Sequence, residues 1–192
     1  MHIRAALILA LLTLPACSSS LRPPPASREI LDEQSGTTLT VVAAPLVFAR
    51  ERTDVAAHAR DYATLVAVEI DNSGKYRPYL LLYRWSTVDR RMSAPPDPSD
   101  GELRILADGR TIELKPLERV PIGLTRRREL HLPDHGDVVT HAYTIDAPTL
   151  HFIAGSRSLT VRMPQEQLDV PFELWEDGRA ALGQFVKGTL AP

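Results

Sequence analysis

Short apolar and β-branched runs follow one another along the chain from Thr37 onward, with turn residues between them. The clearest run, Tyr62 to Ile70, is β-branched at alternate positions and carries almost no charge, which is typical of a central strand buried on both faces. The turn cluster Asp71 to Gly74 follows it, and Tyr79 to Trp85 then supplies the second strand of a hairpin. Further strands are predicted over 37–43, 46–49, 138–145, 159–163 and 170–175.

A second hairpin is indicated by strict alternation. Residues 102–107 and 110–114 alternate between apolar and polar positions on either side of Asp108-Gly109. A two-residue Asp-Gly loop between alternating strands is one of the strongest local signals of a β-hairpin. The alternation places the apolar side chains on one face, so we expect this hairpin to be half exposed.

Two helices are predicted in the last third of the chain. Asp146 is placed to cap the first, and Gly155 to end it. Asp177 is placed to cap the second helix, and Gly188 to end it. The pattern as a whole predicts an α+β fold class, mainly antiparallel β, with a sandwich-like sheet of about seven to nine strands and two short C-terminal helices.

The beginning of the chain has a different character. One basic residue, Arg4, precedes the apolar stretch Ala5 to Ala16, which ends in small residues, and this is the layout of a secretory signal peptide. The stretch is too short for a spanning helix, which needs about 20 residues. Residues 17–36 include the Ser- and Pro-rich run Ser18 to Ser27, which predicts a tether because proline lacks the backbone donor that helices and ladders use.

The four residues Leu14-Pro15-Ala16-Cys17 resemble the lipobox of bacterial lipoproteins. The resemblance implies that residues 1–16 are removed as a signal peptide and that Cys17 is acylated at its thiol and its new amino end. Ser18, rather than an aspartate, follows the cysteine, which in Gram-negative lipoproteins implies transfer to the outer membrane. We therefore expect a lipid-anchored protein on the periplasmic face of the outer membrane, with a single β-rich domain over 37–190.

Composition narrows the functional classes. The chain has 192 residues, of which 44% are hydrophobic and 24% charged, so it is an ordinary globular sequence with room for one domain. A formal net charge of -2 gives no electrostatic footprint for nucleic acid. Cys17 is the only cysteine, so acylation would leave the folded domain without a disulfide or a thiol nucleophile. We expect no cofactor.

Three aromatic residues form a stripe along one predicted strand. Tyr79, Tyr83 and Trp85 share a face with Leu81 at a period of two. Aromatic side chains on a sheet can bind sugars or peptides, or a small ligand behind them. The other face of the strand is also apolar, which favours burial on both sides. The stripe is therefore interpreted either as core or as a ligand platform.

One stretch carries the chemistry of metal ligands. Residues 131–137 hold two imidazoles and two carboxylates, and a further histidine follows closely. Imidazole nitrogen and carboxylate oxygen are ligands of zinc and similar ions. The spacing matches no zinc signature, and a polar loop rich in turn residues is the alternative. The metal hypothesis would use His131, Asp134, His135 and His141.

A run of three basic residues lies in the long segment Lys115 to Asp137, which has no clear period. Arg126, Arg127 and Arg128 could contact anionic lipid headgroups or an acidic partner, or they could simply be a solvated surface. Long irregular segments often carry function, so this one is the first place to look for a binding surface.

The search for catalytic motifs is negative. The chain contains no G-x-S-x-G, H-E-x-x-H, P-loop or G-x-G-x-x-G pattern. We therefore expect a lipid-anchored, non-enzymatic protein whose domain binds another envelope component, which could be a protein, peptidoglycan or lipid. A metal-binding protein or metal-dependent hydrolase and a small-ligand carrier are the alternatives.

Overall fold

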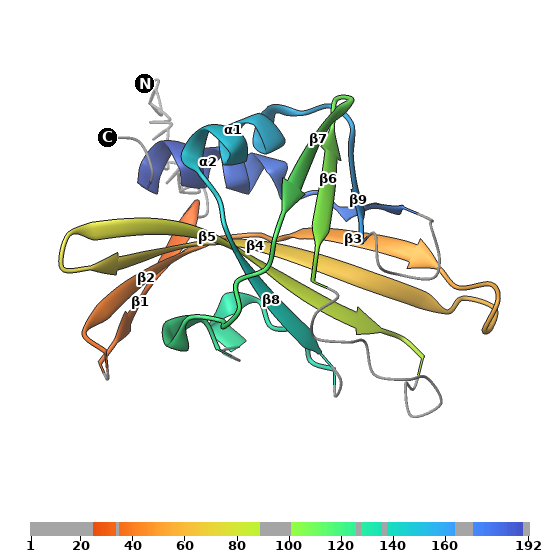
Figure 1. Ribbon diagram of the computed structural model, residues 1–192, viewed down its shortest axis with the longest axis horizontal. Helices are drawn as coiled ribbons and strands as arrows, with labels where there is room; N and C mark the ends of the chain where they lie inside the picture. Colours follow the sequence, from red (N-terminus) through yellow and green to blue (C-terminus); the bar gives the residue numbers. More distant parts are fainter. Residues whose placement is uncertain are drawn as a thin grey trace, which may run out of the picture.

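The computed structural model describes residues 25–33, 35–88, 101–125, 128–135, 138–163 and 171–189 (Figure 1). In these residues the chain forms one sheet in which every strand pairing is antiparallel, together with two α-helices. This confirms the predicted α+β class and the mainly antiparallel sheet. The strands are β1 (Ser27–Asp32), β2 (Thr37–Val42), β3 (Leu46–Glu51), β4 (Arg60–Asn72), β5 (Lys75–Ser86), β6 (Leu103–Ala107), β7 (Arg110–Leu114), β8 (Val139–Thr144), β9 (Leu159–Arg162) and β10 (Phe172–Glu176). The helices are α1 (Ala147–Gly155), α2 (Arg179–Thr189) and the short 3-10 helices η2 (Ile122–Leu124) and η3 (Arg128–Leu130).

The long hairpin of β4 and β5 is the centre of the sheet. Its two strands pair from Asp61 and Ser86 at one end to Asn72 and Lys75 at the turn. The outer edge of β4 pairs with β3 along its first half and with β2 along its second half. The outer edge of β5 pairs with β8. The buried middle of β5, from Tyr79 to Arg84, is thus paired on both sides, as burial of its backbone donors and acceptors requires.

The sheet bends back on itself. From β3 it continues through β10, β9, β6 and β7. The chain after β7 then returns to β8, where the Leu117 amide donates to the Ala142 carbonyl at 2.8 Å. The Tyr143 hydroxyl donates to the Gly101 carbonyl at 2.6 Å, just before β6. The described strands therefore form one continuous, strongly curved sheet rather than the two separate layers of a sandwich.

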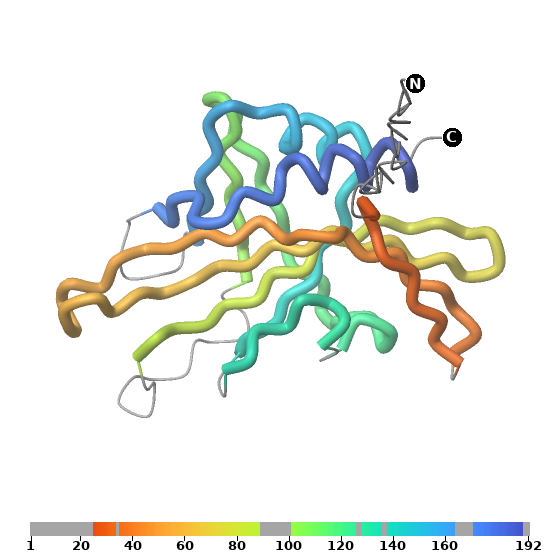
Figure 2. The backbone as a smooth tube through the Cα atoms, turned by 180° about the vertical axis from the view of Figure 1, so that it is seen from behind, coloured from red at the N-terminus to blue at the C-terminus, as the bar shows by residue number. Residues whose placement is uncertain are grey.

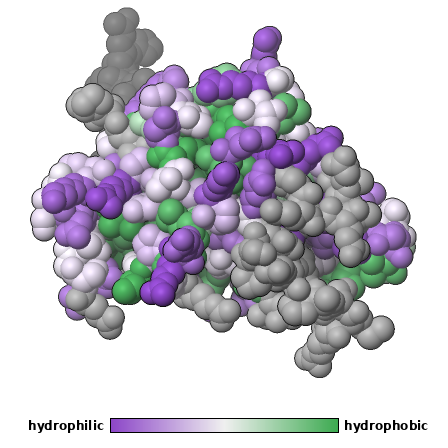
Figure 3. All heavy atoms as spheres, viewed as in Figure 1, coloured by the Kyte–Doolittle hydropathy of each residue, from purple (hydrophilic) through white to green (hydrophobic). Residues whose placement is uncertain are grey.

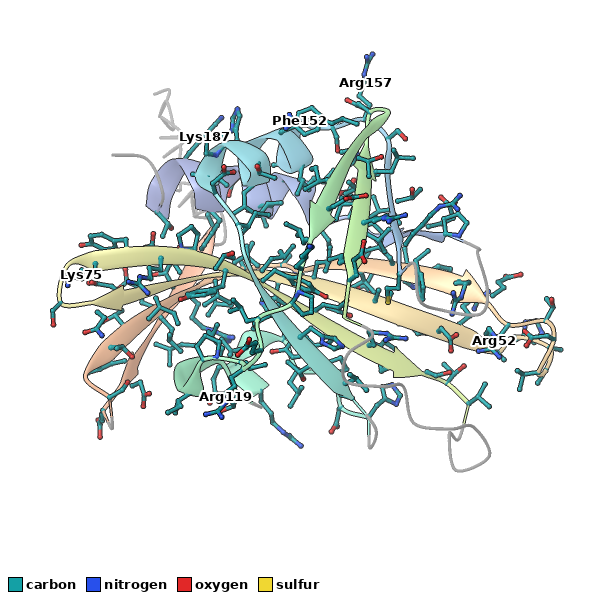
Figure 4. All side chains as sticks on the ribbon, in the orientation of Figure 1. Arg52, Lys75, Arg119, Phe152, Arg157 and Lys187 are labelled. Atoms are coloured by element: carbon teal, nitrogen blue, oxygen red, sulfur yellow. The ribbon has the colours of Figure 1, made fainter. Side chains whose placement is uncertain are left out.

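Different parts of the chain cover the two faces of the central hairpin. Helices α1 and α2 lie side by side on one face, and the segment containing η2 and η3 lies on the other (Figures 1 and 2). Figure 4 shows the same division, with Phe152 and Lys187 on the helix side and Arg119 on the opposite side. We call residues 117–125 and 128–135 the covering segment. Its Leu124 and Leu130 are fully buried, so part of this aperiodic stretch serves the core.

Burial on both faces explains the sequence of β4. Val66 and Val68 point to one face and Leu65 and Ala67 to the other, yet all four are at most 2% exposed. The prediction of a central strand is therefore confirmed.

The outer surface has a different composition. Polar side chains cover most of the coloured surface seen in Figure 3, and apolar side chains show only in separate areas.

Two further local signals are confirmed, the cap of α1 and the turn between β6 and β7, whereas Gly188, predicted to end the second helix, lies inside α2. Asp146 accepts a hydrogen bond from the Thr149 amide at 2.8 Å and caps α1. In the predicted hairpin turn, Asp108 and Gly109 adopt φ values of 47° and 81°. This is the left-handed backbone that an Asp-Gly hairpin loop requires.

One boundary differs from the prediction. Residues 17–36 were expected to form a tether, but Ser27–Asp32 form β1, which pairs with β2 along its whole length. Ile30 lies partly buried against the core, and Arg28 donates a side-chain hydrogen bond to the Glu129 carbonyl. The sequence of β1 did not indicate a strand, because most of its residues are polar. Its strand conformation comes from pairing with β2 rather than from the β propensity of its own residues.

A buried ion pair joins β3 to β4. Arg50 and Asp61 are directly paired in the sheet, their side chains are each 5% exposed, and they form a 2.9 Å salt bridge. Arg52 adds a 3.0 Å contact to the same Asp61 oxygen. Burial alone would raise the Asp61 pKa, but hydrogen bonds from the two arginines and Ser86 outweigh it and hold the pKa below its ordinary value.

We expect Asp61→Asn to lower the free energy of unfolding by about 3–5 kcal/mol at pH 7, because it removes the carboxylate that pairs with the buried Arg50 guanidinium. The folded-state pKa of Asp61 lies below the unfolded value of about 3.9, so its stabilisation is present above that pH and lost as the pH falls through the folded pKa. The variant should therefore lose part of the acid dependence of stability, measured by urea unfolding at several pH values. Asp54→Asn, which removes an exposed partner of Arg52, is the control and should change stability much less. Equal effects of the two variants would contradict the assigned role of the buried pair.

Gly178 allows α2 to begin against the chain between β2 and β3. A Cβ at this position would lie 2.2 Å from the Pro45 carbonyl oxygen and 2.7 Å from that of Ala44, and both are backbone atoms. A Cβ added at Gly188, near the end of α2, would meet no neighbouring atom within 4 Å. Of these two glycines, only Gly178 lies so close to neighbouring backbone atoms that it leaves no room for a side chain.

Gly178→Ala should destabilise the fold, because backbone atoms must move apart, whereas Gly188→Ala should raise the free energy of unfolding by about 0.5–1 kcal/mol through helix propensity. Chemical denaturation of both variants against the wild type measures the difference. Unchanged stability of Gly178→Ala would show that α2 does not pack this closely on residues 44–45.

Candidate functional site

A cleft of about 420 Å³ opens on the sheet face that carries the covering segment. Its floor comes from β3 and β4, and its sides from β5, β10 and the end of the covering segment. Three of its side chains are large aromatic rings and only a few are polar. The lining residues are Pro45, Val47, Tyr62, Thr64, Trp85, His131, Leu132, Pro133, Trp175 and Glu176.

A row of stacked rings forms one side of the cleft. Tyr62 and Trp85 are directly paired across β4 and β5, and their rings stack with centroids 4.0 Å apart and planes 7° apart. His135 stacks on Trp85 with centroids at 4.3 Å and an interplanar angle of 16°. The Trp85 indole also donates to the Thr64 hydroxyl at 3.3 Å. Trp85 is therefore held on both faces and at its nitrogen, which fixes the row.

Trp175 extends the row at a right angle. Its ring lies 6.5 Å from that of Tyr62 with the planes 83° apart. The Arg60 guanidinium lies over the Trp175 ring at 4.7 Å and pairs with Glu51 at 3.1 Å. Trp175 is nevertheless 54% exposed. An indole that is fixed in place and still open to solvent is a ready contact surface for a ligand.

A β-bulge places Trp175 and Glu176 together at the cleft. In β10, Leu174 pairs with Phe48 and Glu176 pairs with Val47, so one extra residue is inserted between them. A bulge of this kind lets consecutive residues point to the same side of a sheet. Both Trp175 and Glu176 consequently line the cleft, where regular alternation would have separated them.

The end of the covering segment forms the opposite side. His131 has a φ of 57°, in the left-handed region that non-glycine residues seldom occupy. Its Nε2 lies 2.8 Å from the Val42 carbonyl oxygen, which attaches the segment to the end of β2. Leu132 and Pro133 follow and line the cleft. The hydrogen bond to β2 holds the backbone in this conformation.

The structure separates the three residues of the aromatic stripe. Tyr79 and Tyr83 are 8% and 0% exposed and belong to the core. Burial raises the pKa of the Tyr83 hydroxyl, which keeps it protonated. Trp85, nearer the end of β5, is only partly buried and lines the cleft. The core interpretation thus describes the two tyrosines, and of the three residues only Trp85 reaches the cleft, where both faces of its ring are covered by Tyr62 and His135.

The four residues of the metal hypothesis do not come together. His135 stacks on Trp85, and Asp134 lies 3.4 Å from Arg128 in an exposed ion pair. His141 is paired with Leu82 in the sheet, so it points to the face opposite Trp85, where it packs against Gly101. Among the described residues, no group of three or more His, Cys, Asp or Glu could hold a metal ion.

The arginine run and the lipidation site can be placed only in part. Arg128 is exposed in η3, on the covering segment that also forms one side of the cleft. Arg126, Arg127 and Cys17 lie outside the described residues. None of the helices within the described ranges is long and apolar enough to cross a bilayer.

Sequence reasoning missed Tyr62 and Trp175 as site residues. Tyr62 begins one predicted strand and Trp175 ends another. Neither strand has aromatic residues at alternate positions, so neither residue was singled out. The only available signal was that both are large aromatic residues at strand ends. Their meeting depends on β10 lying beside β3, which is a long-range pairing.

No family model matches the chain, and no curated protein or solved structure matches it either.

The cleft geometry can be checked by fluorescence, because the chain has two tryptophans. In Trp85→Phe the emission comes from the exposed Trp175 ring, and acrylamide should quench it strongly. In Trp175→Phe it comes from Trp85, which is covered by Tyr62 and His135, so the quenching slope should be clearly smaller. Equal slopes would show that the stacked row does not form.

Proposed function

We propose that this protein is a lipid-anchored envelope protein that binds another envelope component through the aromatic cleft, without catalysing a reaction. Acylation of Cys17 would hold it at the periplasmic face of the outer membrane. The observation that carries the binding role is the exposed Trp175 ring, fixed at a right angle to Tyr62 on the edge of an open cleft.

The make-up of the cleft supports binding. Small-molecule and fragment sites are concave, mostly apolar, largely preformed and about 300–1,000 Å³ in volume. The cleft has these properties, and its floor consists of strands that pair on both sides. A rigid aromatic surface loses little conformational entropy when a ligand binds.

The polar groups of the cleft support a role without catalysis. Acid–base and nucleophilic catalysis need a reactive group within hydrogen-bond reach of a base, which a third group orients. Of the described lining residues, His131 uses its Nε2 to hold the backbone at Val42, and Glu176 is exposed. The Thr64 hydroxyl accepts from the Trp85 indole rather than facing a base. These contacts fix the shape of the cleft.

The anchor has its own test. Cys17→Ser removes the only thiol of the chain, so the variant should no longer incorporate a fatty acid, whereas the wild type should be labelled and found in the membrane fraction. Metabolic labelling with a clickable fatty acid, followed by fractionation, measures this. Absence of label on the wild-type protein would contradict lipid anchoring, but it would not bear on the proposed binding site.

The binding role is tested by site-specific photo-crosslinking in living cells. A photoreactive residue in place of Leu132, which lines the cleft, should form an adduct with an envelope component, and Trp175→Ala should abolish it. The same residue in place of Ile122, which is 85% exposed but lies outside the cleft lining, is the control and should form little adduct. Equal adducts at the two positions, or none at Leu132, would contradict the proposed site. Arg128→Ala in the same assay tests whether the arginine run adds to the contact.

A further inference from the structure

We infer that the cleft recognises a sugar ring, so that the envelope component it binds is a glycan. This inference rests on the proposed binding function and names its ligand class. A pyranose ring has an apolar C–H face and a rim of hydroxyl groups. A site that fits it needs an exposed aromatic surface and, beside that surface, hydrogen-bond acceptors for hydroxyl donors.

The aromatic half of this requirement comes from Tyr62 and Trp175. Their planes are 83° apart, so together they form a corner rather than a slot. Trp85 lies behind Tyr62, with both of its faces occupied, and therefore supports the corner without offering a face of its own. One face of Tyr62 is covered by Trp85 and one face of Trp175 by Arg60, so a ring that enters the cleft would lie against the remaining face of the exposed Trp175 indole.

The polar half comes from the bulge in β10. It places Glu176 next to Trp175 on the same side of the sheet, so a carboxylate stands directly beside the aromatic corner. Two carboxylate oxygens can accept hydrogen bonds from neighbouring hydroxyl groups of one sugar ring. Thr64 on the cleft floor is only 4% exposed and its oxygen accepts the Trp85 indole proton, so Glu176 supplies the polar contact and Thr64 holds the row in place.

The charges around the cleft disfavour ionic ligands. A carboxylate beside aromatic rings would suit an ammonium group, but the Arg60 guanidinium already lies over the Trp175 ring at 4.7 Å. That face of Trp175 is therefore already occupied by a cation. Because Arg60 is paired with Glu51 at 3.1 Å, the charge that an anionic ligand would meet in the cleft lining is that of Glu176. A neutral ligand that presents hydroxyl donors meets neither obstacle.

A peptide fits the cleft less well. An extended peptide that adds to a sheet needs a free strand edge, but β3 and β4 at the cleft floor both have partners on each side. Proline-rich peptides dock on aromatic grooves through donors that meet their carbonyl groups. The Trp85 indole is already bonded to Thr64, so a proline-rich peptide would depend on the Tyr62 hydroxyl and the Trp175 indole for those donors.

The inference is tested by titrating the full-length protein, in detergent micelles, with the trimer of β-1,4-linked N-acetylglucosamine. This trimer is neutral, so it avoids the charge of Glu176. We expect saturable binding by calorimetry together with a change in tryptophan emission. Trp175→Ala should weaken the affinity at least tenfold, and Trp175→Phe, which keeps a ring, should retain most of it. Glu176→Gln, which keeps an acceptor but loses the charge, should weaken it less than Trp175→Ala.

Tyr76→Ala is the matched control, because Tyr76 is an aromatic residue that is 63% exposed near the turn of the β4–β5 hairpin. It should bind the trimer as the wild type does. Circular dichroism confirms that each variant is folded.

Absence of saturation at sugar concentrations up to about 10 mM would overturn the inference. So would binding that Trp175→Ala leaves unchanged, or binding of decaproline in place of the trimer with the same dependence on Trp175. Crosslinking from Leu132 separates this failure from failure of the proposed function. Adducts with a protein, together with no sugar binding, would refute the glycan and leave the binding role standing.

Discussion

The burial of the β4–β5 hairpin on both faces is the constraint on which the other elements depend. A buried strand must have its backbone donors and acceptors paired at both edges, and β2, β3 and β8 supply these pairs. Its side chains must also be covered on both faces. The two helices cover one face and the covering segment, with Leu124 and Leu130, covers the other. The described part of the domain is therefore organised outward from this hairpin.

The cleft lies where that cover ends. The covering segment is attached to β2 through His131 and to β5 through the stack of His135 on Trp85. Beyond this point the sheet face is open, and the rings of Tyr62 and Trp175 stand on strands whose own positions the core has already fixed. The buried pair of Arg50 and Asp61 joins β3 and β4, the strands of the cleft floor, on the opposite face of the sheet. The proposed site therefore has rigid support, which favours recognition with little rearrangement.

Much of the fold could be predicted because its signals are local. The alternation around Asp108-Gly109 and the cap at Asp146 depend on neighbouring residues, and the structure confirms both. Strand β1 was missed because its residues are polar and its order comes from pairing with β2. The site could be predicted least well. Sequence periodicity found Trp85, but it had no means of bringing Trp175 to Tyr62 across the bulge in β10.

The sequence by itself determined the fold class, the central hairpin, the helices and the two hairpin turns, since periodicity and turn chemistry act over a few residues. Only the tertiary structure decided which polar residues meet. It separated His141 from His131 and His135 by placing it on the opposite face of the sheet, and it brought an aromatic corner and Glu176 to one cleft. The physical reason is that side-chain direction follows strand register and bulges, and these are set by pairing between residues far apart in the chain.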